Sequence, residues 1–190
     1  MIRRSDFYLI PNILSLSRIL AIPLVAGLAY YDENLWAAAA FALAGVSDYI
    51  DGWVARRYHY ESKLGMLLDP LADKIIVLSV MVILLFLGRL DMQIEGYDTR
   101  WIAPFLVIVT VGREIGITGL RSIASAEGVV MPADRWGKLK TWIQFFSLIF
   151  LLLNRDPYLF LGKILLLVSV AAALWSGLRY TLWFVKKLPE

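Results

Sequence analysis

Long apolar runs separated by short polar breaks make up most of the chain. A helix needs about 20 predominantly apolar residues to cross the hydrocarbon layer of a bilayer, and six runs approach that length. The breaks carry turn residues, among them Asp32, Asn34, Gly88 and Pro157. The pattern therefore predicts six transmembrane helices, over residues 14–31, 35–55, 66–88, 101–121, 138–154 and 158–184.

The first dozen residues have a different pattern. Arg3 and Arg4 precede a short apolar stretch that ends at Pro11. Such a segment is typical of a helix lying in the membrane interface, with its arginines toward the lipid headgroups. We predict a short interfacial helix over residues 1–12. It is followed by the six spans, and the whole chain, residues 1–190, forms a single membrane domain.

Composition agrees with an all-α integral membrane protein. Of the 190 residues, 59% are hydrophobic and 18% are charged, against about 25% charged in a typical soluble domain. Cysteine is absent and His59 is the single histidine. Disulfide scaffolds, thiolate metal sites and multi-histidine zinc sites are thereby excluded. Carboxylates remain as the ligands for a hard metal ion. We expect membrane lipids around the protein and no nucleic acid as a partner.

Positive charge is concentrated on one side of the predicted membrane. Six spans put both termini on the same side, and that side holds all but four of the 19 lysines and arginines. The four on the other side are Arg89, Arg100, Arg155 and Lys163. Because basic residues favour the cytoplasmic side, the termini are predicted to be cytoplasmic. The chain shows no targeting extension, so we expect the inner membrane of a bacterium.

Several ionisable residues lie inside the predicted spans rather than beside them. All are near the cytoplasmic ends, whereas the outer halves of the spans are rich in Leu, Ile and Val. A charge at the bilayer centre costs at least about 2.5–3.5 kcal/mol, so this many charges imply a shared polar cavity that opens to the cytoplasm. The residues are Asp48, Asp51, Asp69, Asp73, Lys74, Arg113, Glu114 and Arg121, with Lys138 and Lys140.

Two pairs of aspartates have spacings that place each pair on one helix face. Asp48 and Asp51 are three residues apart, and Asp69 and Asp73 are four residues apart on the next helix. A short connection makes the two helices antiparallel neighbours, so the four carboxylates can converge. Four negative charges repel one another in a low-dielectric site, and one or two divalent ions with oxygen ligands would balance them. Mg²⁺ or Mn²⁺ is favoured because soft ligands are absent.

The residues around these aspartates resemble the signature of the CDP-alcohol phosphotransferase family. The pattern in this chain is Asp48-x2-Asp51-Gly52-x2-Ala55-Arg56-x8-Gly65-x3-Asp69-x3-Asp73. The resemblance covers roughly residues 8–145, and six helices agree with the family fold. It implies an enzyme that transfers a phosphatidyl group from a CDP-linked lipid to an alcohol and releases CMP.

The resemblance also implies roles for particular residues. Asp48, Asp51 and Asp69 would bind the divalent metal at the pyrophosphate. Asp73 would complete the metal site and act as the general base. The residues that would bind CDP are Asn12, Ser15 and Arg18 on the first span, with Gly52, Ala55, Arg56, Ser62 and Gly65.

A second group of basic residues lies downstream. Arg113 and Arg121 are eight residues apart, about two helical turns, so they share a helix face. Arginine binds phosphate through two hydrogen bonds and lysine as a point charge, so the group predicts a site for an acceptor that carries a phosphate. Ordinary positive-inside charge explains the side of the membrane but not the depth of Arg113. We expect Glu114 to pair with a nearby arginine. The predicted acceptor-phosphate residues are Arg113, Arg121, Lys138, Lys140 and Thr141.

These downstream runs resemble the members of the family that use sn-glycerol 3-phosphate as acceptor. The implied reaction takes CDP-diacylglycerol and glycerol 3-phosphate and gives phosphatidylglycerophosphate and CMP. A homodimer is expected. Gly116 and Gly119 depart from the relatives, and they either loosen the fourth span or mark a close packing contact.

Two alternatives remain at this point. The same chemistry could use another acceptor, either phosphatidylglycerol, to make cardiolipin, or inositol phosphate. A protein of a different class, an ion or metal transporter, could also line its path with carboxylates. Transport would need polar residues through the full membrane depth, whereas here they stop near the cytoplasmic ends.

Overall fold

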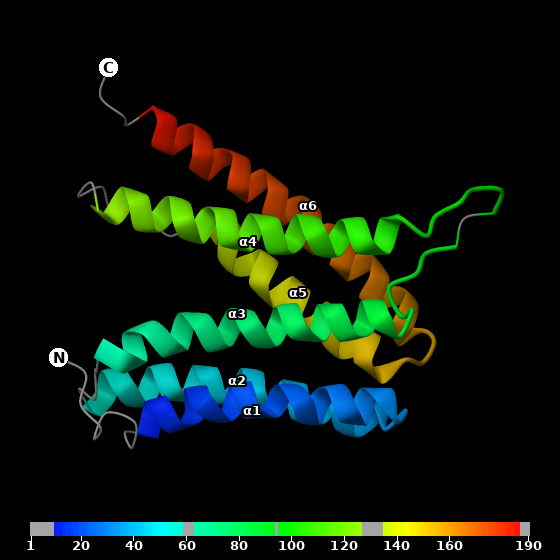
Figure 1. Ribbon diagram of the computed structural model, residues 1–190, viewed down its shortest axis with the longest axis horizontal. Coiled ribbons are helices and arrows are strands. Elements are labelled where there is room, and N and C mark those ends of the chain that lie inside the picture. The colour runs from blue at the N-terminus through cyan, green and yellow to red at the C-terminus, as the bar shows by residue number, and fades with distance from the viewer. Residues whose placement is uncertain (1–9, 59–62, 94, 127–134, 187–190) are drawn as a thin grey trace.

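The computed structural model describes residues 10–58, 63–93, 95–126 and 135–186. Side-chain surroundings are described for residues 12–47, 71–93, 95–126, 137 and 139–186. The described residues form six α-helices and contain no β-strand (Figure 1). The prediction of an all-helical protein is confirmed. The helices are α1 (Ile10–Tyr30), α2 (Asn34–Tyr58), α3 (Lys63–Phe86), α4 (Ile102–Ala126), α5 (Arg135–Leu153) and α6 (Tyr158–Val185).

The helix ends lie close to the predicted ones, within five residues at every end. The largest differences are at the start of α1 and the end of α4. Pro11 was predicted to end a separate interfacial helix, and this boundary is wrong because α1 already begins at Ile10. Proline is tolerated in the first turn of a helix, where its missing N–H has no intrahelical partner to lose. The rest of the predicted interfacial helix, residues 1–9, lies outside the described residues.

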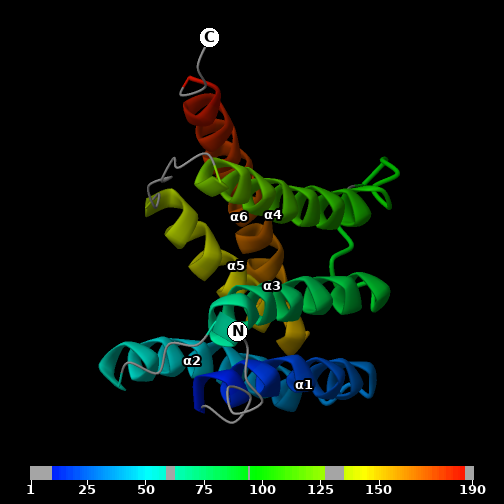
Figure 2. The same ribbon diagram turned by 60° about the vertical axis from the view of Figure 1, so that its left-hand side comes forward.

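The six helices are arranged as a group of three, a bridging pair and a single outer helix. α1 packs against α2 and α3. α5 and α6 pack closely against each other, and they run obliquely across the molecule (Figure 2). α5 also contacts α2 and α3, while α6 contacts α4. The first residues of α1 and the last residues of α6 lie at the same end of the molecule (Figure 1).

Three helical segments in the described residues are long and apolar enough to cross a membrane, and they are Asn12–Tyr30, Ile102–Ala126 and Tyr158–Val185. Shorter apolar stretches are Asn34–Ser47 and Leu139–Leu153. Large apolar side chains cover the outside of the bundle, with Leu20 at 72% and Ile108 at 68% exposed. Extensive apolar surface of this kind marks contact with another apolar phase, which agrees with a membrane protein.

Small residues allow the helices to approach one another closely. Ala29, Ala37 and Ala72 are fully buried. At Gly162 in α6, an added Cβ would lie 2.9 Å from Leu151 Cγ and 3.1 Å from the Leu151 backbone nitrogen of α5. The Ser147 hydroxyl donates to the Gly162 carbonyl at 2.7 Å. Because lipid gives little hydrophobic force between helices, close backbone contact and interhelical hydrogen bonds hold membrane bundles together. Gly162 provides such a contact between α5 and α6.

Two of the helices end in the same capping geometry, opposite the chain termini. Asp32 follows α1 with φ +58° and Gly88 follows α3 with φ +68°. The next residue along donates back to the last turn, Glu33 N–H to the Leu28 carbonyl at 2.8 Å and Arg89 N–H to the Leu84 carbonyl at 3.0 Å. This left-handed residue with its backward bond satisfies carbonyls that a helix end otherwise leaves unpaired.

Arg89 joins three helices at this end. Its guanidinium donates to the Leu152 carbonyl in α5 at 3.0 Å and to the Ala29 carbonyl in α1 at 2.9 Å. It also contacts Asp32 at 3.3 Å. Arg89 is only 5% exposed. Burial lowers its pKa below the usual value, and the Asp32 charge partly opposes this shift. Arg89, in the connection after α3, therefore links the ends of α1 and α5.

Candidate functional site

A cavity of about 220 Å³ lies between α2, α3, α4 and α5. One part of its wall is charged, with Asp73 and Lys74 from α3, Glu114 from α4 and Lys140 from α5. Another part is apolar. The apolar lining includes Gly45, Val77, Leu78, Trp142 and Phe145. The cavity therefore offers charged groups and apolar surface to the same ligand.

Asp73 connects the cavity to a buried polar face of α1. Its carboxylate oxygen lies 3.5 Å from Arg18 Nη1, and its side chain is 52% exposed while that of Arg18 is 1% exposed. Arg18 also donates to the Ser15 hydroxyl at 3.3 Å. Asn12, Ser15 and Arg18 recur at intervals of three residues and are all buried. A polar face this well buried lies inside the bundle next to Asp73, and its part in binding CDP stays a prediction.

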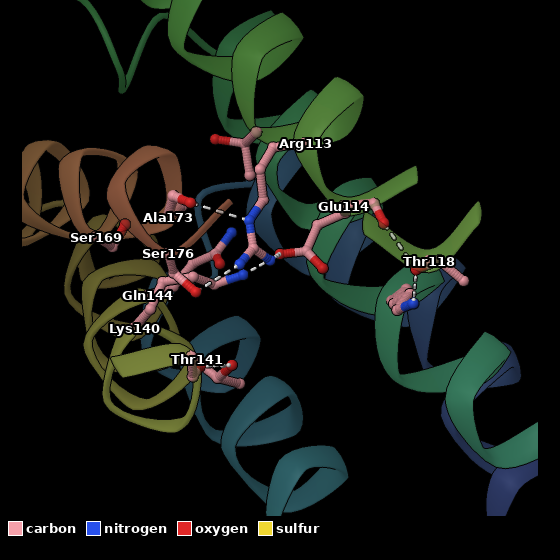
Figure 3. Close-up of polar contacts among 12 residues, drawn as sticks. Arg113, Glu114, Thr118, Lys140, Thr141, Gln144, Ser169, Ala173 and Ser176 are labelled. Atoms are coloured by element: carbon pink, nitrogen blue, oxygen red, sulfur yellow. Dashed lines mark hydrogen bonds and ion pairs between the residues drawn. The ribbon is translucent and has the colours of Figure 1, made fainter. Parts of the chain in front are cut away.

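A cationic cluster of Lys74, Arg113, Glu114 and Lys140 lies beside the cavity, and Figure 3 shows Arg113, Glu114 and Lys140 together. The same Glu114 oxygen accepts from Arg113 Nη1 at 3.2 Å and from Lys140 Nζ. Lys74 donates to the Thr118 hydroxyl, which in turn donates to the Glu114 carbonyl at 2.7 Å. The predicted pairing of Glu114 with an arginine is confirmed. Arg113 and Lys140 share the Glu114 carboxylate, and Lys74 is linked to the Glu114 backbone through Thr118, so the cluster carries a positive excess.

Arg113 is held from the other side by α6. Its Nε donates to the Ala173 carbonyl at 3.1 Å, and its Nη2 donates to the Ser176 hydroxyl at 3.3 Å (Figure 3). Two turns further along α4, Arg121 donates to the Tyr180 hydroxyl at 3.0 Å. Its guanidinium carbon also lies 5.0 Å from the centre of the Tyr180 ring. Both arginines thus lie on one face of α4, as their eight-residue spacing predicted, and that face meets α6.

The side chains of the other residues predicted to bind CDP or metal lie outside the described part of the chain. The backbone of α2 is helical through Asp48 and Asp51, and that of α3 is helical through Asp69 and Asp73. Ser62 falls outside the described residues. Gly52, Ala55 and Arg56 in α2, and Gly65 in α3, belong to the same two helices. The convergence of the four carboxylates stays a prediction.

The donor set fits a divalent ion. Continuous helix through each aspartate pair gives the spacings of three and four residues that put both members of a pair on one face. α2 and α3 contact each other, and Asp73 opens onto the cavity. Among side chains that the structure describes, no group of three metal-binding residues is found, because three of the four aspartates lie beyond that set. Carboxylate oxygens without sulfur ligands suit Mg²⁺ or Mn²⁺.

Of the remaining residues predicted to bind the acceptor phosphate, Lys140 and Thr141 line the cavity. Lys140 is buried in the cationic cluster. Thr141 lines the cavity, and its hydroxyl donates to the Gly137 carbonyl of its own helix at 3.0 Å. The side chain of Lys138 lies outside the described part. No atom of the described residues lies within 4 Å of a Cβ built at Gly116 or Gly119, so the suggested close packing contact is not found there.

Sequence reasoning missed the contribution of α6. Its residues that meet the two arginines are Ala173, Ser176 and Tyr180, and Gly177 lies beside the Arg113 side chain. Their spacing of three, four and seven residues defines one face of a helix. A small and polar face in an apolar helix is a signal for helix packing in membranes. It does not by itself indicate which charged group it meets.

The family model for CDP-alcohol phosphatidyltransferases matches residues 8–175 of the chain. The chain belongs to this family, and it is an enzyme of this class. The resemblance inferred from the aspartate signature is confirmed, and the transporter alternative is set aside.

Named relatives cover most of the chain. A CDP-diacylglycerol–glycerol-3-phosphate 3-phosphatidyltransferase of Pseudomonas fluorescens is 34% identical over 181 residues, 90% of this chain and 87% of that protein. A protein of the same name from Bacillus subtilis is 31% identical, over 90% of this chain and 89% of its own length. A CMP-forming cardiolipin synthase of Oryza sativa is 33% identical over 90% of this chain, but the match covers 56% of that protein.

Proposed function

We propose that the protein transfers the phosphatidyl group of CDP-diacylglycerol to sn-glycerol 3-phosphate, giving phosphatidylglycerophosphate and CMP. The observation that carries the choice of acceptor is the cationic cluster beside Asp73. Bacterial relatives that match over most of their own length are named for this reaction. The rice relative is named for cardiolipin synthesis. Phosphatidylglycerol is therefore tested as an alternative acceptor.

Charge balance favours an acceptor that carries a phosphate monoester. Within the described part of the chain, Lys74, Arg113 and Lys140 lie around the Glu114 carboxylate, while Asp73 of the same cavity is paired with Arg18, so these groups together have an excess of two positive charges. The Lys140 and Arg113 side chains are 4% and 11% exposed. Buried charge that lacks a counter-charge is costly, so the cluster is suited to a dianion. A phosphate monoester near neutral pH provides that charge.

The donor side of the proposed site follows from the aspartates and from α1. A divalent ion, Mg²⁺ or Mn²⁺, would be held by Asp48, Asp51, Asp69 and Asp73, and when bound it would neutralise the donor pyrophosphate and the departing CMP. The proposed CDP contacts are the buried face of α1, with Asn12, Ser15 and Arg18, and the signature residues Gly52, Ala55, Arg56, Ser62 and Gly65.

Asp73 is the proposed general base. It lines the same cavity as Lys140 and is half exposed there, so a hydroxyl of a bound acceptor can reach it. The carboxylate takes the proton of the acceptor hydroxyl, and the hydroxyl oxygen attacks the phosphorus that bears the diacylglycerol. The bond from that phosphorus to the CMP oxygen breaks and CMP leaves. Arg18 lies 3.5 Å from Asp73 and helps to hold its carboxylate in place.

The proposed setting is a bacterial inner membrane crossed by all six helices, with the cavity open to the cytoplasm. Supporting this, the first residues of α1 and the last residues of α6 lie at the same end of the molecule (Figure 1), as six crossings require. The protein would act as a single membrane domain over residues 1–190 and as a homodimer. Light scattering of the purified protein in detergent measures the oligomeric state.

The decisive experiment measures CMP release by the purified full-length protein in mixed micelles with CDP-diacylglycerol. Glycerol 3-phosphate, phosphatidylglycerol and inositol phosphate are offered separately, with Mg²⁺, with Mn²⁺ and with a chelator. We expect metal-dependent release with glycerol 3-phosphate. Asp73→Asn should lower the rate about 10²- to 10⁴-fold, the contribution typical of general base catalysis. Asp91→Asn, an exposed aspartate after α3, is the matched control. Release with only another acceptor would overturn the proposed substrate.

A further inference from the structure

We propose that the α6 face formed by Ala173, Ser176, Gly177 and Tyr180 is a positioning element for the acceptor phosphate. This α6 cradle acts by fixing the guanidinium groups of Arg113 and Arg121. The inference rests on the proposed function, because it assumes that these arginines meet the anionic acceptor. It assigns a role to the helix nearest the C-terminus, which carries none of the predicted site residues.

Each nitrogen of the Arg113 guanidinium has a defined partner. Nε meets the Ala173 carbonyl, Nη2 meets the Ser176 hydroxyl and Nη1 meets Glu114. A guanidinium has five N–H donors in a rigid fork, so these three bonds orient the group. In the described part of the chain they leave two N–H donors for a phosphate oxygen.

Gly177 lets the arginine lie against the α6 backbone. A Cβ built at Gly177 would stand 3.6 Å from Arg113 Cγ and 3.7 Å from Arg113 Nε, which is ordinary contact distance. Ser176 is fully buried, so its hydroxyl belongs to the interior between α4 and α6 rather than to the surface. The arginine stem and its charged head are therefore both defined by one turn of α6.

Arg121 is held in a comparable way by Tyr180, the last residue of the α6 cradle. The Tyr180 hydroxyl accepts from Arg121 Nη2, and the Tyr180 ring lies near the same guanidinium. Arginine side chains lose substantial rotamer entropy when they are immobilised by a ligand. A cradle that immobilises two arginines before the acceptor arrives reduces this cost, so it lowers the KM for the acceptor more than it changes kcat.

The test compares Ser176→Ala, Ser176→Thr and Ser169→Ala in the full-length enzyme. Ser169 is a matched control because it is buried in the same helix, while its hydroxyl donates to the Leu166 carbonyl of α6 itself at 2.7 Å. We expect Ser176→Ala to raise the KM for glycerol 3-phosphate about tenfold or more, the effect of losing one hydrogen bond to a charged group. The KM for CDP-diacylglycerol should stay unchanged. Ser176→Thr keeps the hydroxyl and should restore most of the acceptor affinity.

The outcomes separate positioning from a general structural role. If Ser176→Ala changes both KM values equally, or changes neither, the cradle has no specific link to the acceptor and the inference is wrong. Calorimetric titration with inorganic phosphate is a second readout that does not need turnover. The unaltered enzyme could lack activity with glycerol 3-phosphate while Ser176→Ala still weakens phosphate binding. In that case the proposed substrate is wrong and the proposed role of the cradle is supported. If phosphate does not bind the unaltered protein, the cradle fails.

Discussion

Two arginines with little exposure, Arg89 after α3 and Arg113 in the middle of α4, have different partners. Arg89 donates to the Leu152 and Ala29 carbonyls at helix ends, and its acidic contact Asp32 is 80% exposed. Arg113 donates to one carbonyl and one hydroxyl of α6 and shares the partly buried Glu114 with Lys140. The first set of partners satisfies helix ends. The second set leaves positive charge next to a cavity.

The comparison shows that the surroundings of a buried arginine indicate its role better than its burial does. At the Arg89 end, each hydrogen bond satisfies a backbone carbonyl that a helix terminus exposes, so the charge serves the packing of α1, α3 and α5. Around Arg113, by contrast, a second cation, Lys140, contacts the same Glu114 carboxylate. That arrangement costs stability unless an anion binds. Arginine therefore supports the fold at Arg89, and at Arg113 it belongs to the cluster that we propose as a ligand site.

The largest effect is expected from Arg113→Met. Truncating one member of a buried, hydrogen-bonded charge pair costs about 2–5 kcal/mol, so the KM for glycerol 3-phosphate should rise about 30-fold or more. Steady-state kinetics of CMP release measure the change, with Arg179→Met as the control because Arg179 is exposed on α6. An unchanged acceptor KM would remove the distinction between the two arginines.

Arg89→Met should have the complementary effect. Two helix-end carbonyls would lose a charged donor, at about 1–2 kcal/mol each, so the free energy of unfolding should fall by about 2–4 kcal/mol. Both KM values should remain as in the unaltered protein. Unfolding in detergent measures the change. Arg100→Met in the same connection removes an arginine that contacts the exposed Asp98, and it should leave stability unchanged. A raised acceptor KM in Arg89→Met would contradict the comparison.

The smallest effect is expected from Gly162→Ala, which tests the contact between α5 and α6. The added Cβ would meet the Leu151 backbone nitrogen at 3.1 Å, and forcing extra volume into a packed contact costs about 1–3 kcal/mol. Gly27→Ala is the matched control, since a Cβ at Gly27 meets nothing within 4 Å in the described residues. Alanine is favoured over glycine inside a helix by about 0.5–1 kcal/mol, so Gly27→Ala should be neutral or stabilising. Thermal unfolding of both variants measures the change in stability, and equal stability of the two would contradict the close contact at Gly162.

The fold could be predicted well from sequence because apolar runs and their polar breaks define helix ends directly. The error at Pro11 has a physical cause, since proline stops a helix in its interior but fits its first turn. The common face of Arg113 and Arg121 also followed from helical spacing. The depth of Arg113 had no explanation in the sequence, and the structure supplies one in the carbonyl of Ala173 and the hydroxyl of Ser176.

Two parts of the molecule could not be predicted from sequence. The role of Arg89 depends on carbonyls from two other helices, and backbone carbonyls carry no sequence signal. The role of Ser176 depends on which helix packs against α6, and a lone serine in an apolar helix is compatible with many neighbours. The aspartate signature gave a sharper prediction because its spacing and chemistry are local to two adjacent helices.

The oblique course of α6 turns it into a lever. Gly162, where α6 is pressed against α5, and Ser176, where it meets Arg113, are separated by roughly 21 Å along the helix axis. A tilt of about 3° around the Gly162 contact would move Ser176 by about 1 Å, which is enough to spoil a hydrogen bond of ordinary length. The position that α6 gives to Arg113 thus depends on the close contact between Gly162 and Leu151 of α5.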